Sequence, residues 1–281
     1  MSTLSHETKP KNRTLFHSNP VLSRLSKITE RSETNAASYR GVAMKTTYFL
    51  LITLVGVVAQ LLVQAAMANE PVWQEIKVYE KFIVSLTKKE TIIAGAVLVV
   101  GFISEMVAIF GRKTVPVSGT IYSISQGYVI SFLVFKVLKG YEYLGLEALL
   151  LTVAVVAVMS YLYSSGIIKA NKKFHTVLLT LVLGSIGVGV LTFLGTLIPA
   201  TRPYVQAMTH NAGLSIALDV IGLVIAALFL ISDFSTVDEC VKQNYPKEYE
   251  WSAAFGLVFT VIWIYLKILD LLMQVAGKNK D

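Results

Sequence analysis

The chain has 281 residues, of which 54% are hydrophobic and only 15% are charged, and its mean hydropathy is +0.62. This apolar content exceeds that of an ordinary soluble domain, so the composition favours a protein embedded in a lipid bilayer. The net charge of +7 does not indicate nucleic-acid binding, because the basic residues lie in the N-terminal tail and in short loops. The single cysteine, Cys240, excludes an intramolecular disulfide.

Residues 1–45 precede the first apolar run. They are rich in Ser, Thr, Asn and charged residues and poor in aromatic residues, so they predict a disordered, basic cytoplasmic tail. An alternative role for this tail is attraction to anionic lipid headgroups, although Glu7, Glu30 and Glu33 reduce its positive charge.

Seven apolar segments follow, each long enough to cross about 30 Å of hydrocarbon as a helix. The predicted spans are 46–68, 91–110, 117–138, 144–164, 175–199, 212–232 and 250–274. Together they predict an all-α integral membrane protein with one seven-helix domain, 46–275, and a short C-terminal tail, 276–281. The first span ends at residues 66–68 (AMA), which resemble a signal-peptidase site, but the apolar run is too long for a signal peptide. We therefore expect a retained helix.

The distribution of Lys and Arg predicts the orientation. With a cytoplasmic N-terminus, the cytoplasmic segments carry fifteen of these residues and the opposite side carries nine, with Lys267 inside the bilayer. Because cytoplasmic loops are enriched in Lys and Arg, we expect the N-terminus in the cytoplasm and the C-terminus outside.

Polar residues within the spans are costly in hydrocarbon and are candidates for function. Asp219 in the sixth span and Lys267 in the seventh lie at a similar predicted depth, near the outer surface. Gln60 and Gln64 in the first span share one helix face at a similar depth, so we predict an outer polar belt. The alternative is that Asp219 and Lys267 form a neutral pair that only sets the helix register.

A second group of polar residues lies toward the cytoplasm, comprising Glu105, Gln126, Thr260 and Asp233 at the inner end of the sixth span. Asp219 and Asp233 are fourteen residues apart, which places both on roughly the same face of a helix. We interpret the two groups as a polar path through the bundle, with an outer ion pair and an inner carboxylate.

Other classes of function lack support in the sequence. The histidines, His6, His17, His175 and His210, lie in the tail or at span ends, so we predict no intramembrane haem or zinc site and no cofactor. Motifs of metalloproteases, phosphate loops and nucleophile elbows are missing, so we do not expect an enzyme. A retinal protein is also disfavoured, because Trp263 stands four residues before Lys267, where those proteins usually carry an aspartate.

Several separated segments resemble the Bax inhibitor (transmembrane Bax inhibitor motif) family, in particular a bacterial subgroup with an extended N-terminal tail. The similar segments are 19–24 (NPVLSR), 41–46 (GVAMKT), Ile168-Lys169 with Lys173-Phe174, 229–234 (FLISDF) and the last helix over 250–266. The resemblance implies six helices around a central seventh, and roles in calcium leak, pH-sensitive cation permeation and resistance to cell death.

The family pattern also implies a pH-responsive pair of aspartates near the cytoplasmic face. Asp233 matches the first position, but the second falls on Thr260, which cannot ionise. Gln126 similarly replaces an acidic residue that is common in the third helix. The coupled titration expected of two close carboxylates is therefore missing from this sequence.

Two hypotheses remain. In the first, the chain is a cation (calcium or proton) leak channel or a regulator of ion homeostasis, with Asp233 and Glu105 in an inner gate and Asp219 with Lys267 in an outer constriction. In the second, it is a non-transporting scaffold that binds another membrane protein, such as a quality-control protease. Both place the chain in a bacterial plasma membrane.

Overall fold

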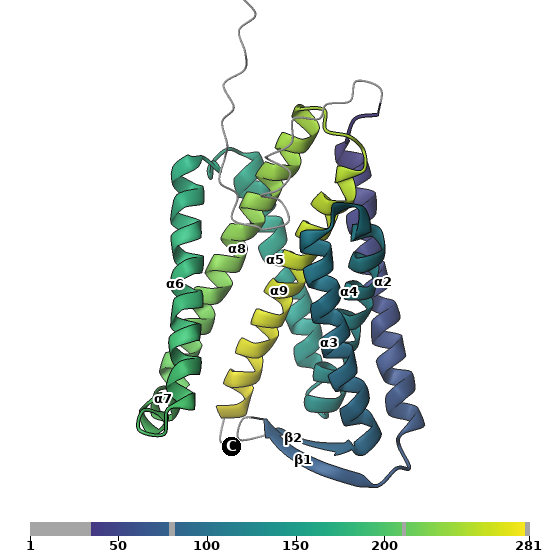
Figure 1. The fold of residues 1–281 in the computed structure, drawn as a ribbon, viewed down its shortest axis with the longest axis vertical. Coiled ribbons are helices and arrows are strands. Elements are labelled where there is room, and N and C mark those ends of the chain that lie inside the picture. Colours follow the sequence, from purple (N-terminus) through teal and green to yellow (C-terminus); the bar gives the residue numbers. More distant parts are fainter. Residues whose placement is uncertain (1–34, 79–81, 210–211, 279–281) are drawn as a thin grey trace, which may run out of the picture.

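The computed structural model describes residues 35–78, 82–209 and 212–278. The helices are α2 (Tyr39–Ala66), α3 (Lys88–Phe110), α4 (Val115–Ser131), α5 (Tyr143–Ser164), α6 (Lys172–Leu197), α7 (Arg202–Thr209), α8 (Ala212–Lys242) and α9 (Tyr249–Lys278). A 3-10 turn, η1 (Arg112–Thr114), precedes α4, and a π-helical segment, η2 (Phe132–Val137), extends it. With η1, α4 and η2 taken as one continuous segment, all but α7 are long and apolar enough to cross a membrane, which confirms the predicted seven-span fold. Figure 1 shows these helices aligned along the long axis of the molecule.

The last helix, α9, lies in the middle of the bundle (Figure 1) and contacts α2, α4, α5 and α8. Half of its most apolar 18-residue stretch is buried, whereas only 6% of the corresponding stretch of α6 is buried. The other helices expose apolar side chains such as Leu62, Phe102 and Leu191 on their outer faces. Since lipid tails are as apolar as these side chains, such exposure fits a bilayer and not water.

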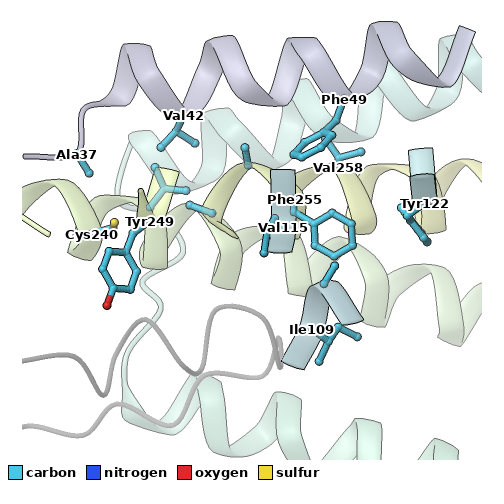
Figure 2. Packing of buried hydrophobic residues seen from close by; sticks show 14 of the residues in the cluster. Ala37, Val42, Phe49, Ile109, Val115, Tyr122, Cys240, Tyr249, Phe255 and Val258 are labelled. Atoms are coloured by element: carbon cyan, nitrogen blue, oxygen red, sulfur yellow. The ribbon is translucent and has the colours of Figure 1, made fainter. Parts of the chain in front are cut away.

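The core at the N-terminal end of the bundle is built around α9. Figure 2 shows Phe255 and Val258 of α9 beside Phe49 of α2, with Val115 and Tyr122 of α4 close by. The ring centroids of Phe49 and Tyr122 lie 6.0 and 5.2 Å from that of Phe255, in edge-to-face geometries that favour aromatic packing. These contacts hold α2 and α4 against the central helix.

A two-stranded antiparallel hairpin occupies the connection between α2 and α3. Strands β1 (Val72–Val78) and β2 (Phe82–Thr87) pair from Val78 with Phe82 to Val72 with Thr87. Phe82, Val84 and Leu86 alternate with more exposed residues and pack on Leu138 and Leu144, which covers the end of the bundle. The hairpin adds a short β element to the helical bundle, and its burial alternates with a period of two residues, which is typical of a half-buried strand.

Helix α8 continues to Lys242, well past the predicted end at residue 232. The extension is stable because Val237 and Cys240 are buried in the core with Tyr249, and Lys242 pairs with Asp238 at 2.5 Å. Asp233 therefore lies inside the helix and not at its end.

The first helix begins at Tyr39, seven residues before its predicted start at 46, and the chain is ordered by contacts from Asn35 onward. The Ala37 N–H donates to the carbonyl of Tyr245, and the Lys247 N–H donates to the carbonyl of Asn35. Ser38 caps the helix by accepting the Gly41 N–H at 3.0 Å. Residues 1–34 of the predicted tail lie outside the described residues.

Helices α2 and α4 approach closely at two glycines. A Cβ atom on Gly127 would overlap the Thr53 carbonyl oxygen, and one on Gly56 would overlap the Ile124 carbonyl oxygen. Small residues allow this close backbone approach in membrane proteins.

We predict that Gly127→Ala lowers the free energy of unfolding in detergent by about 1–3 kcal/mol, because the added methyl group must push the helix backbones apart. The thermal unfolding midpoint, monitored by size-exclusion chromatography, measures this change. Gly95→Ala is the matched control, since nothing lies within 4 Å of that added Cβ. Equal midpoints for the two variants would contradict the close approach.

Candidate functional site

The interface between α8 and α9 carries polar contacts at two levels. The helices are antiparallel, so residues early in α8 face residues late in α9. Asp233 meets Thr260 at the level nearer the N-terminus of α9, and Asp219 meets Lys267 at the other. Asp219 and Asp233 are fourteen residues apart on α8, and Thr260 and Lys267 are seven residues apart on α9. Each spacing places its two residues on one helix face, and these two faces form a single interface.

At the inner level, Asp233 is fully buried and Thr260 is 1% exposed. The Thr260 hydroxyl donates to Oδ2 of Asp233 at 2.5 Å. A hydroxyl donor at this position satisfies one carboxylate oxygen without adding a second charge. The position that the family pattern gives to a second aspartate is therefore in direct contact with Asp233 in this chain.

His175 lies beside this inner level, which sequence reasoning missed by treating it as a residue at a span end. Its side chain is 1% exposed, and Nδ1 lies 3.4 Å from Oγ of Ser232, the neighbour of Asp233. The imidazole is buried because the start of α6 packs on α8 through Leu178. The signal was the three-residue spacing of His175 and Leu178, which places both on one helix face.

Glu105 and Gln126 are half-buried on α3 and α4, two helices that contact each other. Within the described residues, neither side chain forms a hydrogen bond or ion pair with Asp233 or Thr260. The structure therefore brings two of the four predicted inner residues together directly and leaves the other two on neighbouring helices.

At the outer level, Nζ of Lys267 lies 2.8 Å from Oδ1 of Asp219. Gln274 donates to the other oxygen of Asp219 at 2.5 Å and accepts a hydrogen bond from the Ser215 hydroxyl at 3.0 Å. The Asp219 and Lys267 side chains are 14% and 30% exposed, so the pair is only partly buried. Gln274 was not among the predicted residues, although it follows Lys267 by seven positions and so shares its face.

The predicted outer belt divides into separate clusters in the described part of the chain. Gln60 accepts the Ser131 hydroxyl at 2.8 Å and donates to Gln64 at 3.0 Å, which joins α2 to α4. Neither glutamine contacts Asp219 or Lys267 through a hydrogen bond.

Lys136, at the end of η2, forms an ion pair with the start of α3. Its Nζ lies 2.7 Å from Oε1 of Glu90, whose other oxygen accepts the Thr87 N–H in a capping box at the start of α3. The ion pair holds the lysine against α3 because Glu90 is 4% exposed and needs a charged donor.

A further buried carboxylate stands at the start of α9. Glu250 is fully buried, accepts the N–H and hydroxyl of Ser38 at 2.9 and 3.1 Å, and pairs with Lys45. Gly41 is required beside it, because a Cβ there would overlap the carboxylate. Sequence reasoning used these residues only as family motifs, and the structure joins them in one contact.

These features define a multi-pass membrane bundle in which two acidic residues of α8 pair with polar residues of α9. The family model described as Bax inhibitor 1 like matches residues 19–277, so the chain belongs to the Bax inhibitor 1-like family. This confirms the resemblance at the level of the family, while the bacterial subgroup stays a prediction. Searches of curated proteins and of solved structures give no match.

We predict that Asp219→Asn and Lys267→Met each lower the free energy of unfolding by about 2 kcal/mol, between the values typical of exposed and buried ion pairs. The exchange variant, Asp219→Lys with Lys267→Asp, should recover part of this loss, since the Gln274 amide can present either its oxygen or its nitrogen. Unfolding midpoints of the single and exchanged variants measure the coupling. Strictly additive losses would contradict a direct interaction.

Proposed function

We propose that this protein is a cation-permeable or ion-regulating bundle, whose path follows the α8–α9 interface. The observation that carries the proposal is the alignment of two acidic residues of α8, Asp219 and Asp233, with polar partners on the central helix. Ionisable groups at membrane depth are costly, and they commonly mark ion or proton pathways.

The outer level supports a constriction that is open to water. A cavity of about 630 Å³ is lined by Lys267, Asp270 and Trp263 of α9 and by Lys77 of β1. Lys267 contributes to this cavity while it also pairs with Asp219. Access of water to one side of the pair would let ions exchange with it, as a constriction requires.

The inner level supports a closed gate. Asp233 is inaccessible and is held by a neutral hydroxyl, so a cation must displace Thr260 to reach the carboxylate. We assign Glu105 and Gln126 to the surrounding polar wall, because their helices border α9 through α4. Movement of α9 relative to α8 would open this level.

We predict that Asp233→Asn reduces calcium or proton flux in proteoliposomes about tenfold, equivalent to the loss of about 1.4 kcal/mol of cation stabilisation. Thr260→Asp should make the flux depend on pH near neutrality, because two close carboxylates share a proton. Asp238→Asn, an acidic residue beyond the inner level on the same helix, serves as the control. Unchanged flux after Asp233→Asn would eliminate Asp233 as the gate.

A scaffold remains the second candidate, and the exposure of α6 favours it. Only 6% of the most apolar stretch of α6 is buried, and its outer face presents Leu183, Leu191 and Phe193. A helix that packs so little on its own bundle offers a surface for another membrane protein such as a quality-control protease.

We predict for this second candidate that a membrane partner copurifies with the full chain and is lost after bulky-to-polar changes on α6, such as Leu191→Ser with Phe193→Ser. Deletion of residues 1–34 tests the tail separately, and it spares Asn35 to Ser38, which belong to the folded bundle. Phe102→Ser, on the exposed face of α3, is the control. Identical partners in all variants would exclude both surfaces.

We also propose that the N-terminal end faces the cytoplasm of a bacterial cell, as the excess of Lys and Arg favours. Lys113 and Lys139 are exposed at opposite ends of the bundle. In intact cells, a membrane-impermeant maleimide should label Lys139→Cys but not Lys113→Cys, and Cys240 is buried and unreactive in the folded protein. Labelling of Lys113→Cys alone would reverse the orientation.

A further inference from the structure

A basic pocket lies at the N-terminal end of the bundle, where α2, η1, α4 and the start of α9 converge. Its volume is about 420 Å³, and its lining residues are Lys45, Arg112, Lys113, Pro116, Lys247, Glu248 and Trp251. From this pocket we infer a binding site for the phosphate headgroup of an anionic phospholipid in the adjacent leaflet. The site is distinct from the proposed ion path and does not depend on it.

The charge of the pocket favours an anion. Four cations, Lys45, Arg112, Lys113 and Lys247, line it against one carboxylate, Glu248. Glu250 neutralises part of the Lys45 charge from below, which leaves the pocket net positive. Among the residues that the structure describes, Lys113 and Lys247 form no ion pair, so both can turn toward a ligand.

Two of the cations are already held in place. The Arg112 guanidinium carbon lies 4.3 Å from the ring centroid of Tyr249, and Nη2 lies 3.5 Å from Oε1 of Glu248. Nζ of Lys45 lies 5.2 Å from the ring centroid of Trp251 while it pairs with buried Glu250. Preorganised donors lose little side-chain entropy on binding, and the planar guanidinium matches phosphate oxygens.

The surroundings indicate a lipid headgroup as the source of the phosphate. Trp251 packs against Tyr48, with ring centroids 5.7 Å apart, at the end of the bundle where interfacial aromatic residues gather. Below the pocket, the neighbouring helices expose rows of apolar side chains. These are Leu51 and Val55 of α2 and Val117 and Ile121 of α4.

The Tyr48 hydroxyl and Oγ1 of Thr120, 3.1 Å apart, join the two helices alongside these rows. Acyl chains of a lipid bound in the pocket can therefore lie along α2 and α4. Basic pockets between membrane helices are a known setting for anionic headgroups.

The test is native mass spectrometry of the purified full chain with equal amounts of phosphatidylglycerol and phosphatidylcholine. We expect preferential retention of phosphatidylglycerol. Arg112→Gln with Lys113→Gln should weaken this binding about 25-fold, and Lys247→Gln alone about fivefold, since each cation near a membrane surface contributes similarly. Lys113→Arg should retain binding.

The matched control is Lys88→Gln with Lys139→Gln, which removes two exposed cations at the opposite end of the bundle. The unfolding midpoint without lipid establishes that each variant is folded, and the exposed loop residue Lys247 carries the test if the double variant does not fold. Equal binding of the two lipids, or equal losses in the control, would overturn the proposal. A rise in the unfolding midpoint with inorganic phosphate but not with phosphatidylglycerol would also overturn the proposal, because the pocket would then bind free phosphate.

Discussion

Carboxylates buried in a lipid-embedded bundle must find donors within the protein, and α9 provides donors for two acidic residues of α8, Asp219 and Asp233. Thr260 donates a hydrogen bond to Asp233, while Lys267 and Gln274 donate to Asp219. A shift of one residue between the helices would separate the partners at both levels and leave acidic groups unsatisfied in an apolar environment. The polar pairs thus select the register in which the surrounding apolar contacts form.

The start of α9 is held by a similar constraint. Glu250 is inaccessible and receives donors from Ser38 and Lys45, both at the beginning of the first helix. Because the first and last helices are linked there, the central helix is anchored at its start independently of the contacts with α8. The basic pocket is built on this same junction, so a ligand in it would bear directly on the position of α9.

Apolar run length was sufficient to predict the seven spans, because the bilayer imposes a minimum length on each helix. The rise of about 1.5 Å per residue in a helix was sufficient to place Asp219 and Lys267 at one depth, and the structure gives the distance between Nζ and Oδ1 as 2.8 Å. Hydropathy could not locate the end of α8, because Val237 and Cys240 extend the helix by packing on neighbouring elements outside the apolar run. The pairs of Glu90 with Lys136 and of Glu250 with Lys45 join residues 46 and 205 positions apart, and local patterns contain no information on such contacts.

The hydroxyl of Thr260 contacts Asp233 at the inner level without adding a second ionisable group. The Thr260 hydroxyl carries its own proton at any physiological pH and can donate it to a hydrogen bond with Asp233. The contact between α8 and α9 therefore does not require a proton shared between two carboxylates. Two carboxylates at the same place would repel each other once both were ionised, and that repulsion would couple the interface to pH. The interface therefore retains Asp233, while the second carboxylate that the family resemblance implies is replaced by Thr260 on α9.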